Sequence, residues 1–236
     1  MKQTTKQKKM TPKAAIFDFD FTLADSSRGI LECVNGALAE LGSRPPETSA
    51  IVATIGLSLP DTFRELTGDT DAALARRFTQ YFHQRADQCM DSLTTVFDCV
   101  GPVLRKIRAA NLRTGIVTTK LNYRINSILN ANNMLDLFDV IVGADDVTKT
   151  KPDPEGLLLA LRKLSVSATS AVYIGDHVID AEAARNAGLP FIAVLTGKHQ
   201  RSSFEPYPNE AIVQSVEDLP GLLLNVTLPS QEILKN

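Results

Sequence analysis

From residue 100 onward the chain alternates short apolar runs with segments of helical spacing, and this alternation constrains the fold more than any other feature. The predicted strands are 114–117, 140–142, 171–174 and 191–194, and the predicted helices are 102–110, 123–131, 154–164 and 180–187. Alternation of this kind is typical of right-handed crossovers and of a parallel sheet covered by helices on both faces. We therefore predict an α/β fold with a Rossmann-like, doubly wound parallel sheet.

Two aspartates follow a further apolar run, residues 14–17, which we predict as the first strand. Asp18 and Asp20 are two residues apart, so their side chains would point to one face if the strand continued. Keeping two carboxylates ionised at that distance costs free energy unless a cation lies between them, and Mg²⁺ prefers such oxygen ligands. The alternative is an acidic turn that closes the strand, because Asp is common in turns.

The stretch between the first strand and residue 100 carries helical signals and no clear strand. Helices are predicted over 30–41, 61–66 and 71–83, separated by prolines and glycines. We interpret this stretch as a helical domain inserted into the sheet domain. The predicted organisation is a flexible tail (1–13), an α/β core (14–25 and 98–225), a helical cap (26–97) and a second tail (226–236).

Polar clusters follow several of the predicted strands directly. Thr118, Thr119 and Lys120 follow one strand, and Asp176 and Asp180 follow another. Lys151, in the segment Lys-Pro-Asp-Pro, lies between a strand and a helix on the same predicted edge. Ligands of open α/β sheets bind beyond the carboxyl ends of the strands, so we expect these side chains to form one site. Asp176 and Asp180 would share one face of a helical turn, which favours a bound cation between the two charges.

In this order and spacing, the motifs DxDxT, strand-end threonine, KPDP lysine and GDxxxD resemble the haloacid dehalogenase superfamily of phosphohydrolases. The resemblance covers about residues 14–225. The helical insertion resembles the cap of the phosphoglycolate phosphatase and β-phosphoglucomutase-like branch. Four motifs in the family's order make the resemblance specific.

The resemblance implies a role for each motif residue. Asp18 is expected to be the nucleophile that forms an aspartyl-phosphate, and Asp20 the general acid and base. Thr118, Thr119 and Lys151 are expected to bind the phosphoryl oxygens. The resemblance implies one Mg²⁺ ion, with the ligands Asp18, Asp20 (through its carbonyl), Asp176 and Asp180. The alternative for Thr118 is a β-branched strand end, and for Lys151 a solvated loop lysine.

Within the cap, the segment 54–58 resembles the glycine-bearing segment that this branch presents to substrate. Gly56, Leu57 and Ser58 are therefore candidate substrate contacts, and Arg64 is a candidate partner for a second anionic group. A glycine in a turn and an arginine on a solvated helix face are the alternatives. The chain departs from the family at Phe21, where Gly is usual.

Two features of the sequence, the second aspartate and the lack of a lysine in the cap, distinguish between the reactions that members of the family catalyse. A dehalogenase does not need the second carboxylate, so Asp20 favours phosphoryl transfer. A phosphonatase needs a cap lysine for its Schiff base, and residues 26–97 contain no lysine. We expect a phosphatase acting on a small phosphomonoester such as phosphoglycolate. A β-phosphoglucomutase-type mutase, a pyrophosphatase and a non-catalytic regulatory protein remain the alternatives.

The amino-acid composition limits which kinds of partner and which cellular compartment we expect for the protein. The 236 residues are 44% hydrophobic and carry a net charge of −2, which suits a protein with a full core and gives no basic surface for nucleic acid. No apolar stretch reaches the roughly 20 residues that span a bilayer, and the basic start has no apolar block behind it. The three cysteines suggest neither a disulfide framework nor a zinc site. We expect a cytoplasmic monomer or homodimer without a signal peptide, whose partner is a small phosphorylated metabolite.

Overall fold

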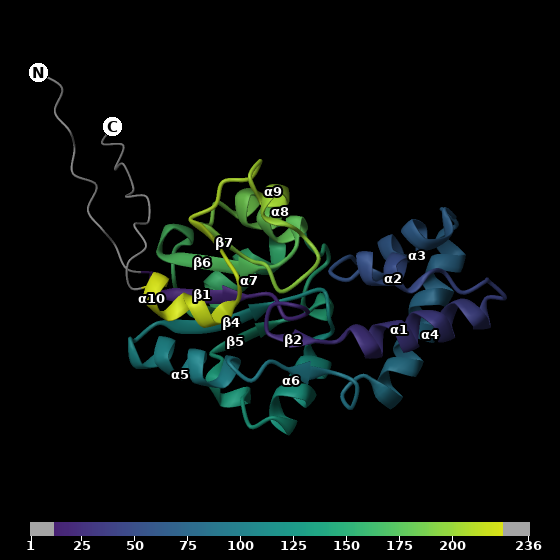
Figure 1. The fold of residues 1–236 in the computed structure, drawn as a ribbon, viewed down its shortest axis with the longest axis horizontal. Coiled ribbons are helices and arrows are strands. Elements are labelled where there is room, and N and C mark those ends of the chain that lie inside the picture. Colours follow the sequence, from purple (N-terminus) through teal and green to yellow (C-terminus); the bar gives the residue numbers. More distant parts are fainter. Residues whose placement is uncertain (1–11, 224–236) are drawn as a thin grey trace, which may run out of the picture.

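One parallel β-sheet organises the fold in the computed structural model, which describes residues 12–223 (Figure 1). Its strands lie in the order β5-β4-β1-β6-β7-β8, and all neighbours are parallel. In chain order the strands are β1 (Ala14–Phe17), β4 (Arg113–Val117), β5 (Val140–Val142), β6 (Ala171–Gly175), β7 (Phe191–Val194) and β8 (Ala211–Val213). The predicted doubly wound parallel sheet is therefore confirmed.

Strand β1 lies between β4 and β6, and its carboxyl end is level with theirs. Phe17 pairs with Ile116 of β4 and with Ile174 of β6. The residues that follow these three strands consequently emerge side by side at one edge of the sheet. That edge is the ligand-binding edge of open α/β sheets.

Helices cover both faces of the sheet because successive side chains of each strand point to opposite faces. Helices α5 (Val100–Ala109), α6 (Asn122–Ala131) and α10 (Leu219–Leu223) cover one face, and α7 (Glu155–Leu164), α8 (Val178–Ala187) and α9 (Arg201–Phe204) cover the other. Phe17 of β1 packs in the first layer, and Ile16 packs in the second. Short 3-10 turns occur at Leu135–Leu137, Ala144–Asp146, Ala168–Ser170 and Val216–Asp218.

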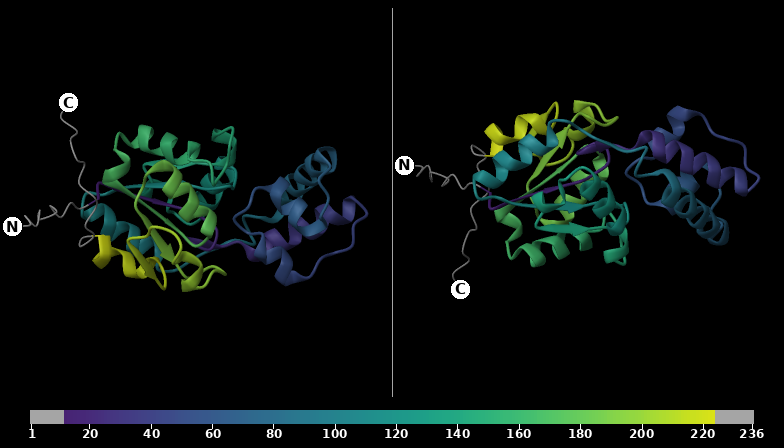
Figure 2. Two further views of the ribbon diagram at one scale, coloured as in Figure 1. Left: turned by 90° about the horizontal axis from the view of Figure 1, so that it is seen from above. Right: turned by 90° about the horizontal axis from the view of Figure 1, so that it is seen from below.

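The helical cap projects beyond the carboxyl end of the sheet as a second body, which both views of Figure 2 show. It comprises α1 (Ser27–Glu40), α2 (Thr48–Ala53), α3 (Leu59–Thr67) and α4 (Ala72–Cys89). Its own hydrophobic core includes Phe63, Phe78 and Phe82, and the rings of Phe63 and Phe78 lie 5.5 Å apart between centroids. Fully burying one such side chain stabilises the fold by about 1.5–3 kcal/mol, so the cap holds itself together largely through this cluster.

Two short strands connect the cap to the sheet domain. β2 (Ala24–Asp25) pairs antiparallel with β3 (Thr95–Val96). The prediction that residues 26–97 contain no strand was wrong for β3. Two residues are too few to show an alternating pattern, and only the pairing with β2 makes them a strand.

Other differences lie at the edges of the fold. β8 was not predicted, and α9 lies within the segment 196–208, which reads as a loop in the sequence. Lys13, the expected last residue of the first tail, instead extends the sheet: its N–H donates to Ser170 O at 2.7 Å and its carbonyl accepts from Arg113 N at 2.9 Å. The remainder of that tail up to residue 11, and the predicted tail 226–236, lie outside the described residues.

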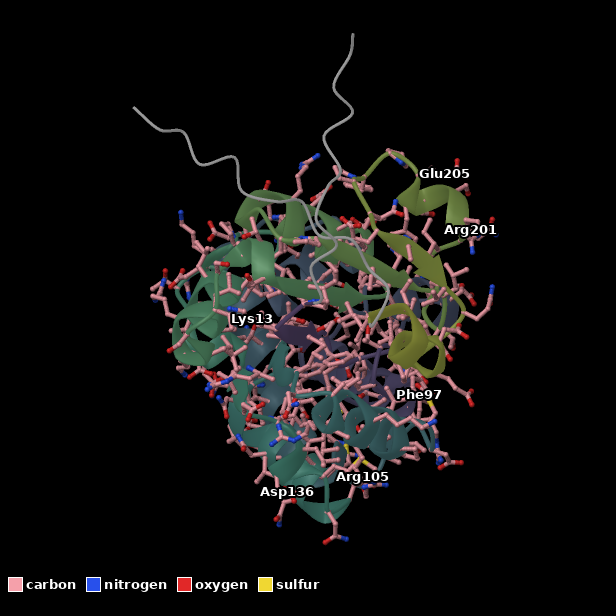
Figure 3. The ribbon with its side chains drawn as sticks, turned by 90° about the vertical axis from the view of Figure 1, so that its left-hand side faces the viewer. Lys13, Phe97, Arg105, Asp136, Arg201 and Glu205 are labelled. Carbon is pink, nitrogen blue, oxygen red and sulfur yellow. The ribbon has the colours of Figure 1, made fainter. Side chains whose placement is uncertain are left out.

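The end of the core opposite the cap carries charged side chains around its rim. Figure 3 looks onto this end, and its labelled residues Arg105, Asp136, Arg201 and Glu205 are all exposed. The polar side chains that are buried lie mostly at the other end, beneath the cap. Within residues 12–223, no helix has the length and apolar character needed to cross a membrane.

Candidate active site

Asp18 directly follows β1 and is 2% exposed. Its backbone N–H donates to Ile174 O of β6 at 2.8 Å, which continues the sheet pairing by one residue and orients the side chain. The carboxylate Oδ1 lies 2.8 Å from Lys151 Nζ, an ion-pair distance, but accepts no aligned hydrogen bond among the described residues. Asp18 is therefore a buried carboxylate with free acceptor capacity.

Asp176 and Asp180 follow β6 and are also buried. Asp176 accepts a hydrogen bond from Thr22 Oγ1 at 3.0 Å. Asp180 lies in the first turn of α8 and accepts from the N–H of His177 at 3.0 Å and from the hydroxyl of Tyr173 at 3.2 Å. The spacing of Asp176 and Asp180 predicted a shared face of one helical turn. Asp176 instead precedes α8, and the turn from β6 into α8 brings the two carboxylates together.

Two glycines leave room for these carboxylates. A Cβ atom on Gly175 would meet the Asp180 carboxylate, and one on Gly197 would meet the Asp176 carboxylate. Gly197 belongs to the segment after β7, whose Thr196 hydroxyl donates to the carbonyl of Phe21. The 196–208 segment thus contacts the site directly.

Lys151 reaches the site from the connection between β5 and α7. Its Nζ lies 2.6 Å from Asp180 Oδ1 and 2.8 Å from Asp18, and it donates to the Tyr173 hydroxyl at 3.1 Å. Thr118 follows β4, is 5% exposed and lines a small cavity together with Lys151. The structure thus brings together all the polar clusters that the strand ends had predicted.

Burial dominates the electrostatics of the cluster. Loss of hydration raises the pKa of Asp18 to about 7, against the opposing effect of Lys151. Burial, then Asp180 and Asp18, raise the pKa of Asp176 well above its ordinary value. Burial alone lowers the pKa of Lys151, but Asp18 and Asp180 more than offset it, and that pKa lies above its ordinary value. Three buried carboxyl groups therefore share one ammonium group, and they can all be ionised at neutral pH only if a further cation balances their charge.

A hard divalent cation would supply that balance. Asp18, Asp176 and Asp180 each offer a carboxylate oxygen, and the three atoms lie within 4.8 Å of one another. All are hard oxygen donors, and Oδ1 of Asp18 still lacks an aligned hydrogen-bond donor. Oxygen donors of this kind suit Mg²⁺, which keeps several waters and shares its shell with phosphate. The carboxylate of Asp20 is not part of this group.

The side chain of Asp20 instead pairs with Lys120. Its Oδ1 lies 3.2 Å from Lys120 Nζ, and both side chains are buried. Lys120 belongs to the polar cluster after β4, but the sequence motifs predicted no role for it. Its position next to two threonines at a strand end was the available signal.

A cavity of about 60 Å³ lies between the cap and the core. Core residues Asp20, Thr119 and Lys120 line it, and cap residues Gly56 and Leu57 face them. Within the described part of the chain, none of the three clustered carboxylates lines this cavity. Asp20 therefore marks the boundary between the carboxylate cluster and the space beneath the cap.

The four cap residues predicted to contact substrate divide into two groups. Gly56 and Leu57 line the cavity, and the Thr119 hydroxyl lies 3.5 Å from Gly56 O. Ser58 instead caps helix α3 by accepting from Asp61 N at 3.3 Å. Arg64 is 60% exposed at its side chain and pairs with Asp61 at 2.6 Å on the cap surface, so the structure does not bring it to the site.

Two cavity residues were missed by the sequence analysis, Arg124 of α6 and His83 of α4. A single arginine or histidine on a helix carries no local pattern that distinguishes it from a surface residue. His177 caps α8 by accepting from Ile179 N at 3.1 Å, and its ring packs edge-on against that of His199.

Comparison with known proteins places this site in a family. The model of the haloacid dehalogenase-like hydrolases matches residues 15–194. The chain is 33% identical over 215 residues to a phosphoglycolate phosphatase of Xylella fastidiosa, covering 90% of this chain and 91% of that protein. A plasmid-borne phosphoglycolate phosphatase of Cupriavidus necator is 32% identical over 215 residues, covering 89% and 92%. A crystal structure from Bacteroides fragilis, described as a haloacid dehalogenase-like hydrolase, matches with a TM-score of 0.86 at 39% identity, covering 88% and 99%.

Proposed function

The chain belongs to the haloacid dehalogenase-like hydrolases, in the phosphoglycolate phosphatase-like branch, and from this premise we propose that it is a Mg²⁺-dependent phosphatase that hydrolyses a small phosphomonoester through an aspartyl-phosphate. One observation carries the proposal: Asp18 lies in a charge-rich buried cluster, and Asp20, two residues on, faces a separate cavity under the cap. A phosphoryl group at Asp18 and a leaving group in the cavity would then have Asp20 between them.

In the first step, a carboxylate oxygen of Asp18 attacks phosphorus in line. The new bond joins this oxygen to phosphorus, and the bond from phosphorus to the ester oxygen breaks. Asp20 in its protonated form gives its proton to the departing alkoxide, which leaves as an alcohol. Lys151, 2.8 Å from Asp18, is placed to bind the oxygens of the transferring group while their charge develops.

In the second step, water hydrolyses the aspartyl-phosphate. The water oxygen bonds to phosphorus while Asp20, now a carboxylate, accepts a proton from that water, and the bond from the Asp18 oxygen to phosphorus breaks to release inorganic phosphate. The protons balance, because Asp20 ends the cycle in the form in which it began. The cap excludes bulk water from the cavity, which strengthens these interactions.

Asp18, Asp176 and Asp180, with the carbonyl of Asp20, are the residues that would hold Mg²⁺. A bound Mg²⁺ supplies positive charge that offsets the repulsion between a carboxylate nucleophile and a phosphate dianion. Thr118 and Thr119, which directly follow β4, would bind phosphoryl oxygens. We further propose that the enzyme acts in the cytoplasm, as a monomer or homodimer, on a small phosphorylated metabolite.

The proposal is tested by phosphate release from purified protein with a panel of small phosphomonoesters, pyrophosphate and sugar phosphates. We expect one preferred phosphomonoester, hydrolysed with Mg²⁺ and not with EDTA. Asp18→Asn is expected to abolish the activity, whereas Asp136→Asn, on the exposed far end of the core, is expected to leave it unchanged. Activity retained by Asp18→Asn would overturn the assignment of the nucleophile.

A further inference from the structure

Cys33 and Cys89 are two free thiols that face each other inside the cap. Cys33 lies on α1, and Cys89 is the last residue of α4, 56 positions further along the chain. Their Sγ atoms are 3.9 Å apart, which is contact distance for two sulfurs. The Sγ of Cys89 donates to Arg85 O at 3.3 Å, which leaves Cys33 as the donor between the two thiols. The two sulfurs are therefore neighbours across a contact between two helices.

Glycines let the two helices approach closely at this point. Helices α1 and α4 pack side by side and antiparallel in the cap (Figure 1). Gly29 and Gly36 lie about one turn before and one turn after Cys33 on α1. A Cβ atom on Gly29 would come within 2.7 Å of Met90 Sδ, and one on Gly36 would touch Arg85 Cγ at 3.7 Å. A disulfide joins Cα atoms only about 4.4–6.8 Å apart, so it requires a close helix approach of this kind.

The two thiols differ in their access to solvent. Cys33 is fully buried in the hydrophobic core of the cap, and Cys89 is half-buried at the edge of that core. Burial, followed by the neighbouring Cys89, raises the pKa of Cys33 to about 12, so Cys33 stays protonated at neutral pH. A cysteine attacks a disulfide as its thiolate, and the reagent must be able to reach it. Cys89 is therefore the sulfur that reacts first with a reagent from solution, and Cys33 is placed to react with Cys89 afterwards.

We propose that Cys33 and Cys89 form a redox-sensitive modification site, at which a small-molecule disulfide such as glutathione disulfide converts the two thiols into a disulfide that joins α1 to α4. The Cys89 thiolate attacks one sulfur of the reagent, which forms a mixed disulfide and releases a first thiolate. Cys33 then gives up its proton and attacks the Cys89 sulfur, which forms the internal bond and releases a second thiolate. The two protein sulfurs lose two electrons in total, and the reagent takes up these electrons and the two cysteine protons to become two thiols. A dithiol reverses the reaction.

The disulfide would connect the two segments through which the cap joins the sheet domain. Helix α1 begins just after β2, and α4 ends shortly before β3. A bond between residues far apart in sequence restricts the unfolded chain, and its effect grows with the length of the closed loop. Val34 and Met90, the chain neighbours of the two cysteines, line the cavity under the cap. Oxidation is therefore expected to stabilise the part of the cap that borders this cavity.

The test equilibrates the purified chain in buffers of reduced glutathione and glutathione disulfide, blocks the remaining thiols by alkylation, and maps each cysteine by mass spectrometry after proteolysis. In oxidising buffers we expect a peptide pair that joins Cys33 to Cys89, and we expect dithiothreitol to remove it. The apparent Tm of the oxidised protein should be higher by roughly 4–16 °C, the range typical of a disulfide in a chain of this size.

Cys99→Ser is the matched control, because Cys99 lies outside the pair, and it should form the same bond with the same rise in Tm. Cys33→Ala should stop at one glutathione on Cys89. Cys89→Ser should gain no glutathione at position 33 and show no rise in Tm. Since Cys89→Ser changes only a half-buried side chain, it keeps the test open if Cys33→Ala does not fold.

The inference is overturned if Cys33 and Cys89 remain free thiols in the most oxidising buffer, or if they join only in denaturant. An unchanged or lower Tm in the oxidised protein would refute the stabilising role of the bond. Glutathione on Cys33 in Cys89→Ser would contradict the order of attack. The inference does not depend on the proposed phosphatase function: if the bond forms and no phosphate is released from any ester, the phosphatase assignment fails and the modification site stands.

Discussion

Lys120 Nζ lies 3.2 Å from Asp20 Oδ1 where the carboxylate cluster meets the cavity under the cap. The side chains of both residues are almost fully buried, at 7% and 9% exposure. An ammonium group in that position fixes the orientation of the Asp20 carboxylate and stabilises the charge that remains after Asp20 gives up its proton. Lys120 is therefore a positioning residue for the proposed general acid.

Lys120→Met is expected to lower kcat/KM for alkyl phosphates about tenfold or more, a part of the roughly 10²–10⁴-fold that general acid catalysis contributes. The effect on p-nitrophenyl phosphate should be much smaller, because its weakly basic leaving group needs no proton. Asp20→Asn should show the same contrast between substrates, and Lys120→Arg should restore part of the loss. An equal loss with both leaving groups would show that Lys120 serves binding and not proton transfer.

Magnesium should stabilise the folded protein. At a Mg²⁺ concentration 100 times its Kd, binding to the native state adds about 2.7 kcal/mol, which corresponds to a rise in Tm of roughly 5–10 °C for a chain of this size. The shift should vanish in Asp176→Asn and persist in Asp136→Asn. In EDTA, Asp176→Asn should unfold at about the same temperature as the wild type, because burial and the neighbouring carboxylates already raise the pKa of Asp176 and disfavour its charged form. A full Mg²⁺ shift in Asp176→Asn would contradict the proposed ligand set.

Phe21 has a left-handed backbone, with φ of 57°. A residue with a Cβ pays about 1–2 kcal/mol in this region, and glycine does not. We expect Phe21→Gly to be more stable than Phe21→Ala by about 1 kcal/mol in urea unfolding, since both variants lose the same ring. The control pair is Gln84→Gly and Gln84→Ala at an exposed position within α4, where glycine should be the less stable by about 1 kcal/mol. The same order at both positions would argue against strain at Phe21.

The lowered pKa of His83 predicts a pH dependence of stability. The folded protein resists protonation of His83, because burial and Arg124 both lower its pKa, whereas the unfolded chain binds a proton near the ordinary value of 6.5. The unfolded state therefore holds more protons below pH 6.5, and the free energy of unfolding falls as the pH falls through that value. Asp87 and Asp145 act in the opposite direction as smaller contributions.

His83→Gln should accordingly lose less stability than the wild type between pH 7 and pH 5, measured by urea unfolding in EDTA. His199→Gln should also lose less stability than the wild type over this range, because burial lowers the pKa of His199 as well. It provides a comparison at a position outside the cavity. Identical pH profiles for His83→Gln and the wild type would show that His83 does not contribute to this dependence.

Features encoded over a few consecutive residues were predictable from the sequence. The first strand, the strand at 191–194 and the strand at 140–142 have the bounds that the apolar runs predicted. The longer helices were predicted because their apolar positions repeat with the helical period, although α4 extends beyond the predicted 71–83 to Cys89. The short helices α2, α9 and α10 were not predicted. β3 was missed because two residues are too few to show a period, and it is a strand only through its pairing with β2. β8 is a half-buried strand at the edge of the sheet, and it was missed although it is as long as β5.

The sequence by itself determined which acids meet, because carboxylates that directly follow the strands of a parallel sheet emerge at one edge whatever the loops do. Asp18 and Asp176 needed no further information, whereas Lys151 reaches them through the connection between β5 and α7. Only the tertiary structure decided which side chains complete the cavity. Arg124 and His83 lie on helices of different domains, and they line one cavity only because the cap packs on the core. Packing between domains depends on the shapes of whole surfaces, which no local pattern records, and the same packing leaves Arg64 on the outside.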